Sequence, residues 1–571
     1  MKRIALALLV LGTFSALVLT ALNKNSSDTP PLTKLKEQYA TKPKPSVDHS
    51  LFPELKKKFK RPQDVTAACI SCHNGRAEGV MHSSHWQWER TEYIAGKGIR
   101  NVGKRNILNN FCIGVQSNEQ SCTRCHVGYG YANNKAYFAD SLDVDCLACH
   151  DNSGTYAKMN EGAGMPDASV NLSYAAQHVG IPTRANCGAC HFFGGGGNNV
   201  KHGDLEEAIF DPARDIDVHM ATDGVNMQCV DCHTAKNHQM LGKMYSVSSM
   251  NRNRVQCESC HGPMPHKDDV LNNHTLKIAC QTCHIPEYAK VNPTKLFWDW
   301  SKAGRLKNGR PYELKDSNGT DVYMSIKGSF KWGKDLKPNY LWFNGTATHY
   351  LLGDKFDPSK PLDINRLMGS YDDPDSKIYP VKVHTAEQIY DTKNDYLIQP
   401  KLYSAKKGDG GFWGDFNWQT SATAGMRAVG LPYSGHYGFT ETKMYWPINH
   451  MVAPKEKAVG CGECHTRSDG RLADVGGFYM PGRDYNPWVE RFGFGLMALT
   501  LAGVFMHGGA RIVVNRKRKR SRLNEEGIYI SPVRAILALD AGRAHYLPWR
   551  YGLRDPRLIH FLRIRTGRRV P

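Results

Sequence analysis

The chain has 571 residues and a formal net charge of +20. The charge is uneven, because Arg511 to Pro571 holds sixteen Lys and Arg against four Asp and Glu, a net +12. A positive charge concentrated at one terminus does not indicate nucleic-acid binding. It is typical of a segment beside the cytoplasmic face of a membrane.

The N-terminal residues predict export. Residues 1–22, MKRIALALLVLGTFSALVLTAL, join a charged start to an apolar run, as a signal peptide or an uncleaved N-terminal anchor does. Either alternative places the residues that follow outside the cytoplasm. Residues 23–65 are polar and contain Lys and Pro, which predicts a linker.

One motif then recurs along the chain. Cys-x-x-Cys-His, the attachment signature of haem c, occurs eight times and uses sixteen of the seventeen cysteines. In each copy the thiols form thioethers with the haem vinyl groups, and the histidine becomes the proximal iron ligand. Structural zinc would need paired spacings that these copies lack. The copies are Cys69/Cys72/His73, Cys122/Cys125/His126, Cys146/Cys149/His150, Cys187/Cys190/His191, Cys229/Cys232/His233, Cys257/Cys260/His261, Cys280/Cys283/His284 and Cys461/Cys464/His465.

The spacing of the copies predicts the domain organisation. Seven copies fall within 66–286, which we interpret as a seven-haem catalytic and electron-transfer region whose core is largely porphyrin. Residues 287–451 lack cysteine, and their Val, Tyr and Ile alternate around Asn-Gly signals, which predicts short hairpins that cover haem edges. Residues 452–486 carry the eighth copy. We therefore expect a mainly α multihaem cytochrome with extensive loops and some short β hairpins.

A membrane helix is expected after the last copy. Phe492 to Ala510 contains nineteen mostly apolar residues, which at about 1.5 Å each just span a bilayer core. We assign 487–514 to this helix and 515–571 to a basic cytoplasmic tail. Trp488 on one side and Arg516–Arg520 on the other orient it by the aromatic-belt and positive-inside rules. His507 could hold a b-type haem only if a partner subunit supplied the second ligand.

Electron-carrying haems usually have a second strong ligand. Thirteen histidines lie between the N-terminal segment and the membrane helix but outside the motifs. Seven bis-histidine haems would use seven of them and leave one iron for chemistry. The expected distal ligands are His85, His178, His202, His238, His266, His274 and His450.

Cys112 marks the second motif as different. It is the only cysteine outside a motif, and it lies ten residues before Cys122. A spare thiol close in sequence to a haem is a candidate for chemistry. Cys112 could be an inert buried thiol, or as a thiolate it could attack a sulfur–sulfur bond.

At these residues the chain resembles a known family, the octahaem tetrathionate reductases. The resemblance rests on the eight motifs, seven clustered and one late, on Cys112 in NNFCIGV, and on NNVKHG after the fourth motif. It covers roughly Thr66 to Arg483. It implies reduction of tetrathionate, nitrite and hydroxylamine at a haem whose iron carries a lysine nitrogen, with a cysteine nearby. The C-terminal helix and basic tail depart from the soluble members of that family.

Carried onto this chain, the resemblance implies that the catalytic haem is the one on Cys122 and Cys125, with Cys112, Lys201 and His126 as its catalytic residues. Lys201 must be neutral to bind iron, which burial beside a ferric centre favours by lowering its pKa. A lysine nitrogen is a ligand that substrate can displace. The alternative interpretation of Lys201 is an ordinary surface charge.

These observations lead to one functional hypothesis and two alternatives. The hypothesis is an enzyme anchored in a bacterial inner membrane, with eight covalently attached haems c in the periplasm, that reduces a small inorganic sulfur or nitrogen oxyanion. Its electrons would come from a quinol-linked membrane donor or a cytochrome. The alternatives are a non-catalytic electron conduit with eight bis-histidine haems, and an enzyme that oxidises hydroxylamine.

Overall fold

The structure is a computed structural model that describes residues 47–111, 113–133, 140–242 and 248–525. The expected signal or anchor segment, Cys112 and the tail beyond residue 525 lie outside the described residues. The chain divides into two units, one ending at Arg483 and one beginning at Asp484.

Each motif lies on a helix or on the turn that follows it. Seven of these eight helices have only four to eight residues, too few for a stable isolated helix in water. Their persistence therefore depends on what they attach to and pack against. The helices are α3 (Pro62–Cys72), α6 (Glu119–Cys122), α7 (Leu147–His150), α9 (Arg184–His191), α10 (Cys229–Cys232), α11 (Glu258–His261), α13 (Cys280–His284) and α16 (Cys461–Cys464).

Short elements connect the motif helices. Two hairpins lie among them, β1 (Arg90–Ile94) with β2 (Gly98–Val102), and β3 (Ala235–Lys236) with β4 (Gln239–Met240). The remaining short helices and 3-10 turns are η1 (His49–Leu51), η2 (Pro53–Leu55), α4 (Arg76–Met81), α5 (Ser84–Gln87), η3 (Thr123–Cys125), η4 (Ser141–Asp143), α8 (Leu172–Gln177), η5 (Glu207–Phe210) and α12 (Asp269–His274).

The region after the seventh motif forms a ten-stranded mixed sheet. The main strand order is β10-β11-β14-β12-β5-β8-β7-β6, with β9 and β13 also paired to β12. Strands β11 and β14, and β12 and β5, are parallel, and the other pairs are antiparallel. The strands are β5 (Thr294–Asp299), β6 (Glu313–Lys315), β7 (Asp321–Met324), β8 (Gly328–Gly333), β9 (Asn339–Phe343), β10 (Ala347–His349), β11 (Leu362–Leu367), β12 (Lys377–Asp391), β13 (Tyr396–Leu397) and β14 (Tyr437–Pro447).

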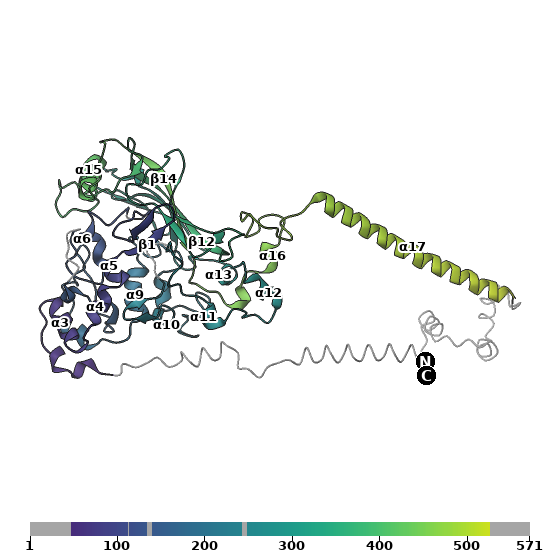
Figure 1. Cartoon of the computed structure of the whole chain (residues 1–571), viewed down its shortest axis with the longest axis horizontal. Coiled ribbons are helices and arrows are strands. Elements are labelled where there is room, and N and C mark those ends of the chain that lie inside the picture. The colour runs from purple at the N-terminus through teal and green to yellow at the C-terminus, as the bar shows by residue number, and fades with distance from the viewer. Residues whose placement is uncertain (1–46, 112, 134–139, 243–247, 526–571) are drawn as a thin grey trace. The chain divides into compact units, whose positions relative to one another are not determined.

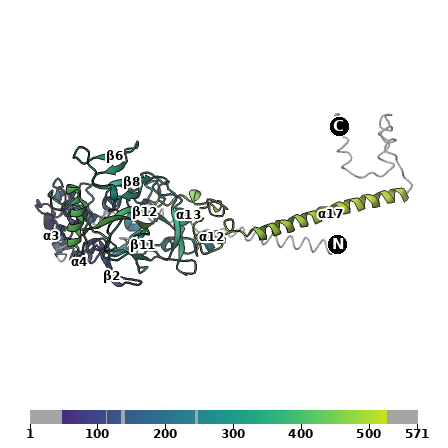
Figure 2. The ribbon, with the colours of Figure 1, turned by 90° about the horizontal axis from the view of Figure 1, so that it is seen from above.

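Strand β12 is the axis of this sheet. Its fifteen residues pair with β14 over eleven positions, Val381–Asp391 against Pro447–Tyr437. Figure 2 shows it between β11 and β8, and Figure 1 shows the motif-bearing helices along one side of β12 and β14. The expectation of a mainly α protein with a few hairpins is therefore wrong for this region. Its long strands form a sheet because the Val, Tyr and Ile positions of distant segments pair across it.

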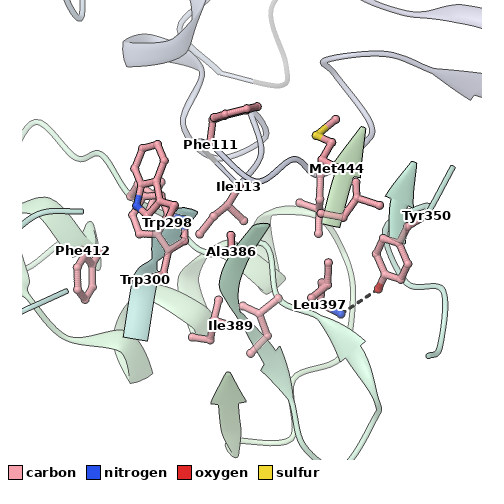
Figure 3. Close-up of a cluster of buried hydrophobic side chains, with 14 of the residues drawn as sticks. Phe111, Ile113, Trp298, Trp300, Tyr350, Ala386, Ile389, Leu397, Phe412 and Met444 are labelled. Carbon is pink, nitrogen blue, oxygen red and sulfur yellow. Dashed lines mark hydrogen bonds between the residues drawn. The ribbon is translucent and has the colours of Figure 1, made fainter. Parts of the chain in front are cut away.

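An aromatic core packs on the sheet. Trp298 and Trp300 stack at 4.7 Å, and Phe412 stacks on Trp418 at 3.9 Å. Phe111 and Ile113, which flank Cys112 in sequence, belong to the same buried cluster (Figure 3). Helices α14 (Phe412–Asp415) and α15 (Trp418–Ala428) and the turns η6 (Trp300–Lys302) and η7 (Lys455–Lys457) complete the region. The core thus ties the second motif's upstream segment to the sheet.

The second unit contains the long helix α17 (Pro487–Glu525). Within it, Pro487–Arg522 is apolar and long enough to cross a membrane, with mean hydropathy 1.5 over its most apolar window. None of that window is buried inside the protein. Large apolar side chains such as Phe505 and Leu499 are more than 70 % exposed. Such a surface is suited to contact with the apolar interior of a bilayer.

Candidate haem and catalytic sites

The motif helices present their two cysteines and histidine in a repeated local geometry. Three of the motif histidines, His73, His233 and His465, end their helices by donating a backbone hydrogen bond to the first cysteine, at 2.8–2.9 Å. All three adopt nearly the same backbone conformation, with ψ of 60–64°. Thiols three residues apart lie on the same side of a helical turn. Each helix can therefore hold two thioether bonds and place the histidine after them.

The second cysteine of the sixth motif is little covered by the polypeptide. Cys260 is exposed, and helix α11, which carries it, has no buried residue. The cause is local, since α11 has only four residues and ends at Gly262, whose φ of +72° stops the helix. Cys260 keeps the helical turn of the motif, because its backbone N–H donates to the Cys257 carbonyl at 3.1 Å. The assignment of Cys260 to a thioether bond therefore stays a prediction, at a position that the polypeptide covers little. Three other motif cysteines are also exposed, namely Cys72, Cys232 and Cys461.

Six motif histidines face a histidine from elsewhere in the chain, with ring centroids 5.9–6.3 Å apart. Two imidazoles on opposite sides of one metal, each with a nitrogen–metal bond of about 2 Å, put their ring centroids about 6 Å apart. The residues therefore fit a haem iron between them. The pairs are His49/His73, His85/His191, His219/His261, His233/His450, His266/His284 and His274/His465.

A seventh motif has a neighbouring histidine at longer range. Burial and the proximity of His150 both lower the pKa of His238. His150 Nδ1 is within hydrogen-bonding distance of the Gly180 carbonyl, at 2.8 Å, which leaves its Nε2 for a metal. The third motif thus has the same pair of residue types as the six above.

Five of the seven expected distal histidines are in these pairs, namely His85, His238, His266, His274 and His450. His178 instead packs on Tyr174 at 4.0 Å, with its Nδ1 2.7 Å from the carbonyl of that residue. His202 packs edge-on against Trp446 at 5.0 Å. His49 and His219 are the partners that sequence reasoning missed.

For His49, the sequence contains a local pattern that indicates an ordered segment. Asp48 is the N-cap of η1 and accepts a hydrogen bond from the backbone N–H of Ser50 at 2.9 Å. An Asp before a helical turn indicates an ordered start, so the segment around His49 is not a plain linker. His219 carries no comparable local pattern.

The second motif is different from the other seven. His126 is only 2 % exposed and is surrounded by Trp86, Trp88 and Tyr131, with ring centroids 5.1–5.3 Å away. Its Nε2 is 2.7 Å from the Trp86 carbonyl oxygen. Burial lowers the pKa of His126 to about 4.

The ring of His126 is oriented differently from those of other motif histidines. The motif histidines His150, His233 and His465 bond a backbone carbonyl through Nδ1, which leaves Nε2 directed elsewhere. His126 uses the opposite nitrogen, the one that would bind iron. In this arrangement the Trp86 carbonyl holds the nitrogen that the sequence assigns to the metal.

Lys201 lies near the segment that contains Cys112. Its Nζ is 4.6 Å from the centre of the Trp446 ring, and Phe111 lies 5.8 Å from the same ring. Gly195, with φ of +84°, brings the loop against Phe111, because a Cβ there would be 3.3 Å from that ring. Lys201 and the neighbour of Cys112 therefore share one aromatic contact, although the sequence separates them by ninety residues.

Buried basic groups surround this place. Lys382 on β12 is fully buried, and its Nζ donates to the carbonyls of Val200 (2.9 Å) and Lys201 (3.1 Å) and to Thr294 Oγ1 (2.5 Å). Burial holds its pKa well below the usual value. His384, two residues on, is fully buried against Phe111 at 4.4 Å. Burial first, and then Lys382 and Lys295, lower the pKa of His384.

The motif thiols show how the haems follow one another. Together their contacts connect the motifs in the order first, third, fourth, fifth, sixth, seventh, eighth, with the second joined to the fourth. Four pairs lie close together, Cys69 with Cys146, Cys125 with Cys190, Cys187 with Cys229, and Cys257 with Cys280. Three further pairs are close enough for their charges to interact, Cys149 with Cys187, Cys232 with Cys260, and Cys283 with Cys464.

Comparisons with known proteins agree with this arrangement. The family models for bacterial cytochrome c and for cytochrome c554 and c-prime match residues 295–468 and 186–262. An uncharacterised protein of Archaeoglobus fulgidus is 26 % identical over 243 residues, which cover 34 % of this chain and 80 % of that protein. The crystal structure of octaheme cytochrome c from Shewanella oneidensis is 44 % identical with a TM-score of 0.69, covering 74 % of this chain and 94 % of that one.

The fold, the paired histidines and these matches define a redox protein that binds haem c. The chain belongs to the multihaem c-type cytochromes, and its described fold is that of the octaheme cytochrome from Shewanella oneidensis.

Proposed function

We propose that this protein is a membrane-anchored octahaem reductase of small sulfur or nitrogen oxyanions, of the tetrathionate reductase type, with its catalytic site at the second motif. One observation carries the proposal. Seven motif histidines have a histidine facing or adjacent, whereas His126 has aromatic rings around it and its Nε2 at the Trp86 carbonyl. A haem held between two histidines offers no position to a substrate, so the exception is the candidate for chemistry.

The haem would supply electrons and an exchangeable coordination position at this motif. Lys201 is the residue that we assign to hold the iron. Its neighbour Lys382 ties the Val200 and Lys201 carbonyls to the sheet and so fixes the backbone from which the side chain extends. His126, which follows Cys125 directly, would hold the iron from the other side.

The charges nearby support an anionic substrate. Lys201, Lys382 and Lys295 lie within one region, and Lys382 and Lys295 are at most 4 % exposed. Burial favours the neutral form of such amines, and an anion that enters the site favours their protonated form. A buried ammonium group then attracts the anion more strongly than it would in water. Reduction of tetrathionate consumes two electrons, breaks the central sulfur–sulfur bond and releases two thiosulfate ions. Cys112 as a thiolate would attack that bond, form a sulfur–sulfur bond to one half of the substrate and release the other half as the first thiosulfate. Two electrons supplied through the haem would then break the new bond, which releases the second thiosulfate and restores the thiolate. The place of Cys112 in the chain next to Phe111 supports this assignment.

The electron path and the anchor complete the proposal. The thiol contacts end at the eighth motif, which directly precedes helix α17 in sequence. A quinol-linked membrane donor would therefore deliver electrons at the eighth motif, and the fourth motif would pass them to the second. Trp488 and Arg516–Arg520 orient the helix with the haem region in the periplasm and the tail in the cytoplasm.

Carbon monoxide binding tests the catalytic assignment. The fully reduced protein, first shown by mass spectrometry to carry eight haems, should bind one carbon monoxide per chain, and substrate anion should compete with it. Binding of none would favour the alternative of a conduit with eight six-coordinate haems. Reduction of tetrathionate by the same preparation with a viologen donor tests the substrate class.

Protease accessibility tests the orientation separately. In intact spheroplasts an epitope placed after Arg522 should survive added protease while the haem region is digested. Digestion of the epitope would reverse the assigned topology and leave the catalytic assignment unaffected.

A further inference from the structure

Asp204 is a buried carboxylate in direct contact with one of the paired histidines. Its side chain is 2 % exposed. Oδ2 accepts hydrogen bonds from the backbone N–H groups of Asn449 (2.8 Å) and His450 (2.9 Å), and from the His450 ring Nδ1 (3.1 Å). His450 faces His233 of the fifth motif with ring centroids 6.3 Å apart. The contact therefore fixes the ring orientation of an expected iron ligand.

The other paired histidines with a recorded Nδ1 contact use weaker partners. His150, His233, His274 and His465 have Nδ1 2.7–3.1 Å from a backbone carbonyl, which is neutral. His219 has a carboxylate nearby, but its Nδ1 is 3.9 Å from Asp217 Oδ1, beyond hydrogen-bonding distance. Among the paired histidines of the described chain, it is thus His450 whose ring forms a hydrogen bond with a carboxylate.

An anionic acceptor changes the chemistry of the ligand. A carboxylate that accepts the Nδ1 hydrogen raises the basicity of the opposite nitrogen, which stabilises the more positive oxidation state of a bound metal. Burial strengthens the effect because the charge is poorly screened. Lys382 lies close enough to interact with Asp204, but its Nζ hydrogen bonds go to Val200, Lys201 and Thr294.

The fifth motif also occupies a critical place. Its Cys229 contacts Cys187 of the fourth motif, and its Cys232 lies beside Cys260 of the sixth. Any path along these contacts from the eighth motif to the second crosses it. A change of potential here would affect every electron that takes that path.

We propose that Asp204 is a positioning residue that lowers the reduction potential of the haem on Cys229 and Cys232. This inference does not depend on which haem reduces substrate. It uses only the His233/His450 pair and the Asp204 contact.

The test is a redox titration of the intact protein, followed by absorbance, with the low-spin ferric signals followed by electron paramagnetic resonance. Asp204→Asn keeps the shape and removes the charge. It should move one haem to a more positive potential and change one ferric signal, with eight haems still attached. Should that variant assemble poorly, Asp204→Ser, which is smaller and also neutral, should give the same positive shift.

Glu206 supplies the matched control. It is a fully buried carboxylate in the same loop, and it accepts hydrogen bonds from the backbone of Val291 (3.3 Å) and Asn292 (3.0 Å) without contacting a paired histidine. Glu206→Gln should titrate like the unaltered protein. An unchanged or more negative potential in both Asp204 variants would overturn the proposal, as would an equal shift in Glu206→Gln, which would indicate loop packing instead of the carboxylate–histidine contact.

Discussion

The second and fifth motifs use the same five-residue signature but surround it with different chemistry. At the fifth motif, His233 has His450 opposite it, and a buried carboxylate holds that partner. At the second, His126 has tryptophan and tyrosine rings around it and bonds a backbone carbonyl. The comparison shows that one signature can lie in two different surroundings. Under the proposed function, the rest of the fold decides whether a haem is suited to electron transfer or to catalysis.

The largest expected effect comes from removing the proposed ligand. Lys201→Ala should lower oxyanion turnover roughly 10- to 100-fold, the usual cost of disturbing a metal site. It should also change the ferric spectrum of one haem and leave the other seven as they are. Steady-state kinetics and electron paramagnetic resonance provide the measurements. Lys307→Ala, at an exposed loop position, is the control and should change neither. Wild-type kinetics and spectra in Lys201→Ala would contradict the proposal that the haem of the second motif is catalytic and differs in this way from that of the fifth.

A substitution at Cys112 should affect the turnover of sulfur and nitrogen substrates differently. Cys112→Ser should lower tetrathionate turnover about tenfold, which corresponds to ~1.4 kcal/mol in the barrier. Nitrite turnover should fall much less, because only the sulfur substrate offers a bond for thiol exchange. The ratio of the two kcat/KM values is the measurement. An equal loss for both substrates would show that Cys112 contributes packing and not exchange.

The reverse experiment removes the facing histidine from one of the paired motifs. His219 faces His261 at 5.9 Å, and His219→Ala should leave that iron one ligand short. Carbon monoxide binding should then rise from one to two per chain, while oxyanion turnover falls less than in Lys201→Ala, because the new open position lacks the buried lysines. His178→Ala is the control, since His178 packs on Tyr174 and should leave the stoichiometry at one. No increase in His219→Ala would mean that His219 is not a ligand.

Much of the haem arrangement was predictable because it is local. The eight motifs define the attachment sites at fixed spacing, and an apolar run of nineteen residues defines α17. The distal partners were only partly predictable, because each comes from a remote segment. His49 lies 24 residues before its partner and His450 lies 217 after its own, and no periodicity connects such positions. His178 and His202 resemble the facing histidines in sequence and differ from them in tertiary contacts.

The depth of each attachment site was not predictable from its motif. Cys260 is exposed at the sixth motif, whereas Cys149 at the third is half-buried, and the two occupy the same position in the same signature. The difference comes from the flanking residues, because α7 buries Leu147 while α11 buries none of its residues. The polypeptide therefore covers the two thiols to different depths, and the flanking residues, which the five-residue signature does not specify, make the difference.

The sheet and the site beside it were the least predictable features. The fifteen-residue strand β12 pairs with β5 and β14, which lie far from it along the chain, so its composition suggested hairpins where the structure has a ten-stranded sheet. Lys382 and His384 alternate along this strand and point to the same side. Their burial beside the Lys201 loop is a consequence of strand pairing, and no sequence motif predicts it.

The smallest predicted effect concerns Lys382, which separates the placement of Lys201 from its chemistry. Lys382→Met keeps most of the side-chain volume and removes the donor shared by the Val200 and Lys201 carbonyls. Leaving buried acceptors unsatisfied costs about 1–3 kcal/mol of folding free energy. The loop should loosen, and oxyanion turnover should fall by about 2- to 10-fold, a change in barrier of ~0.4–1.4 kcal/mol. One haem spectrum should broaden, and the Asp204-dependent potential should move little, because His450 keeps its own contact.

Lys302→Met, exposed at the end of η6, is the control for a general loss of lysine. A loss of turnover in Lys382→Met as large as that in Lys201→Ala would instead assign Lys382 a direct role with the substrate. The sheet would then contribute to the catalytic site of the second motif as much as the Lys201 loop does.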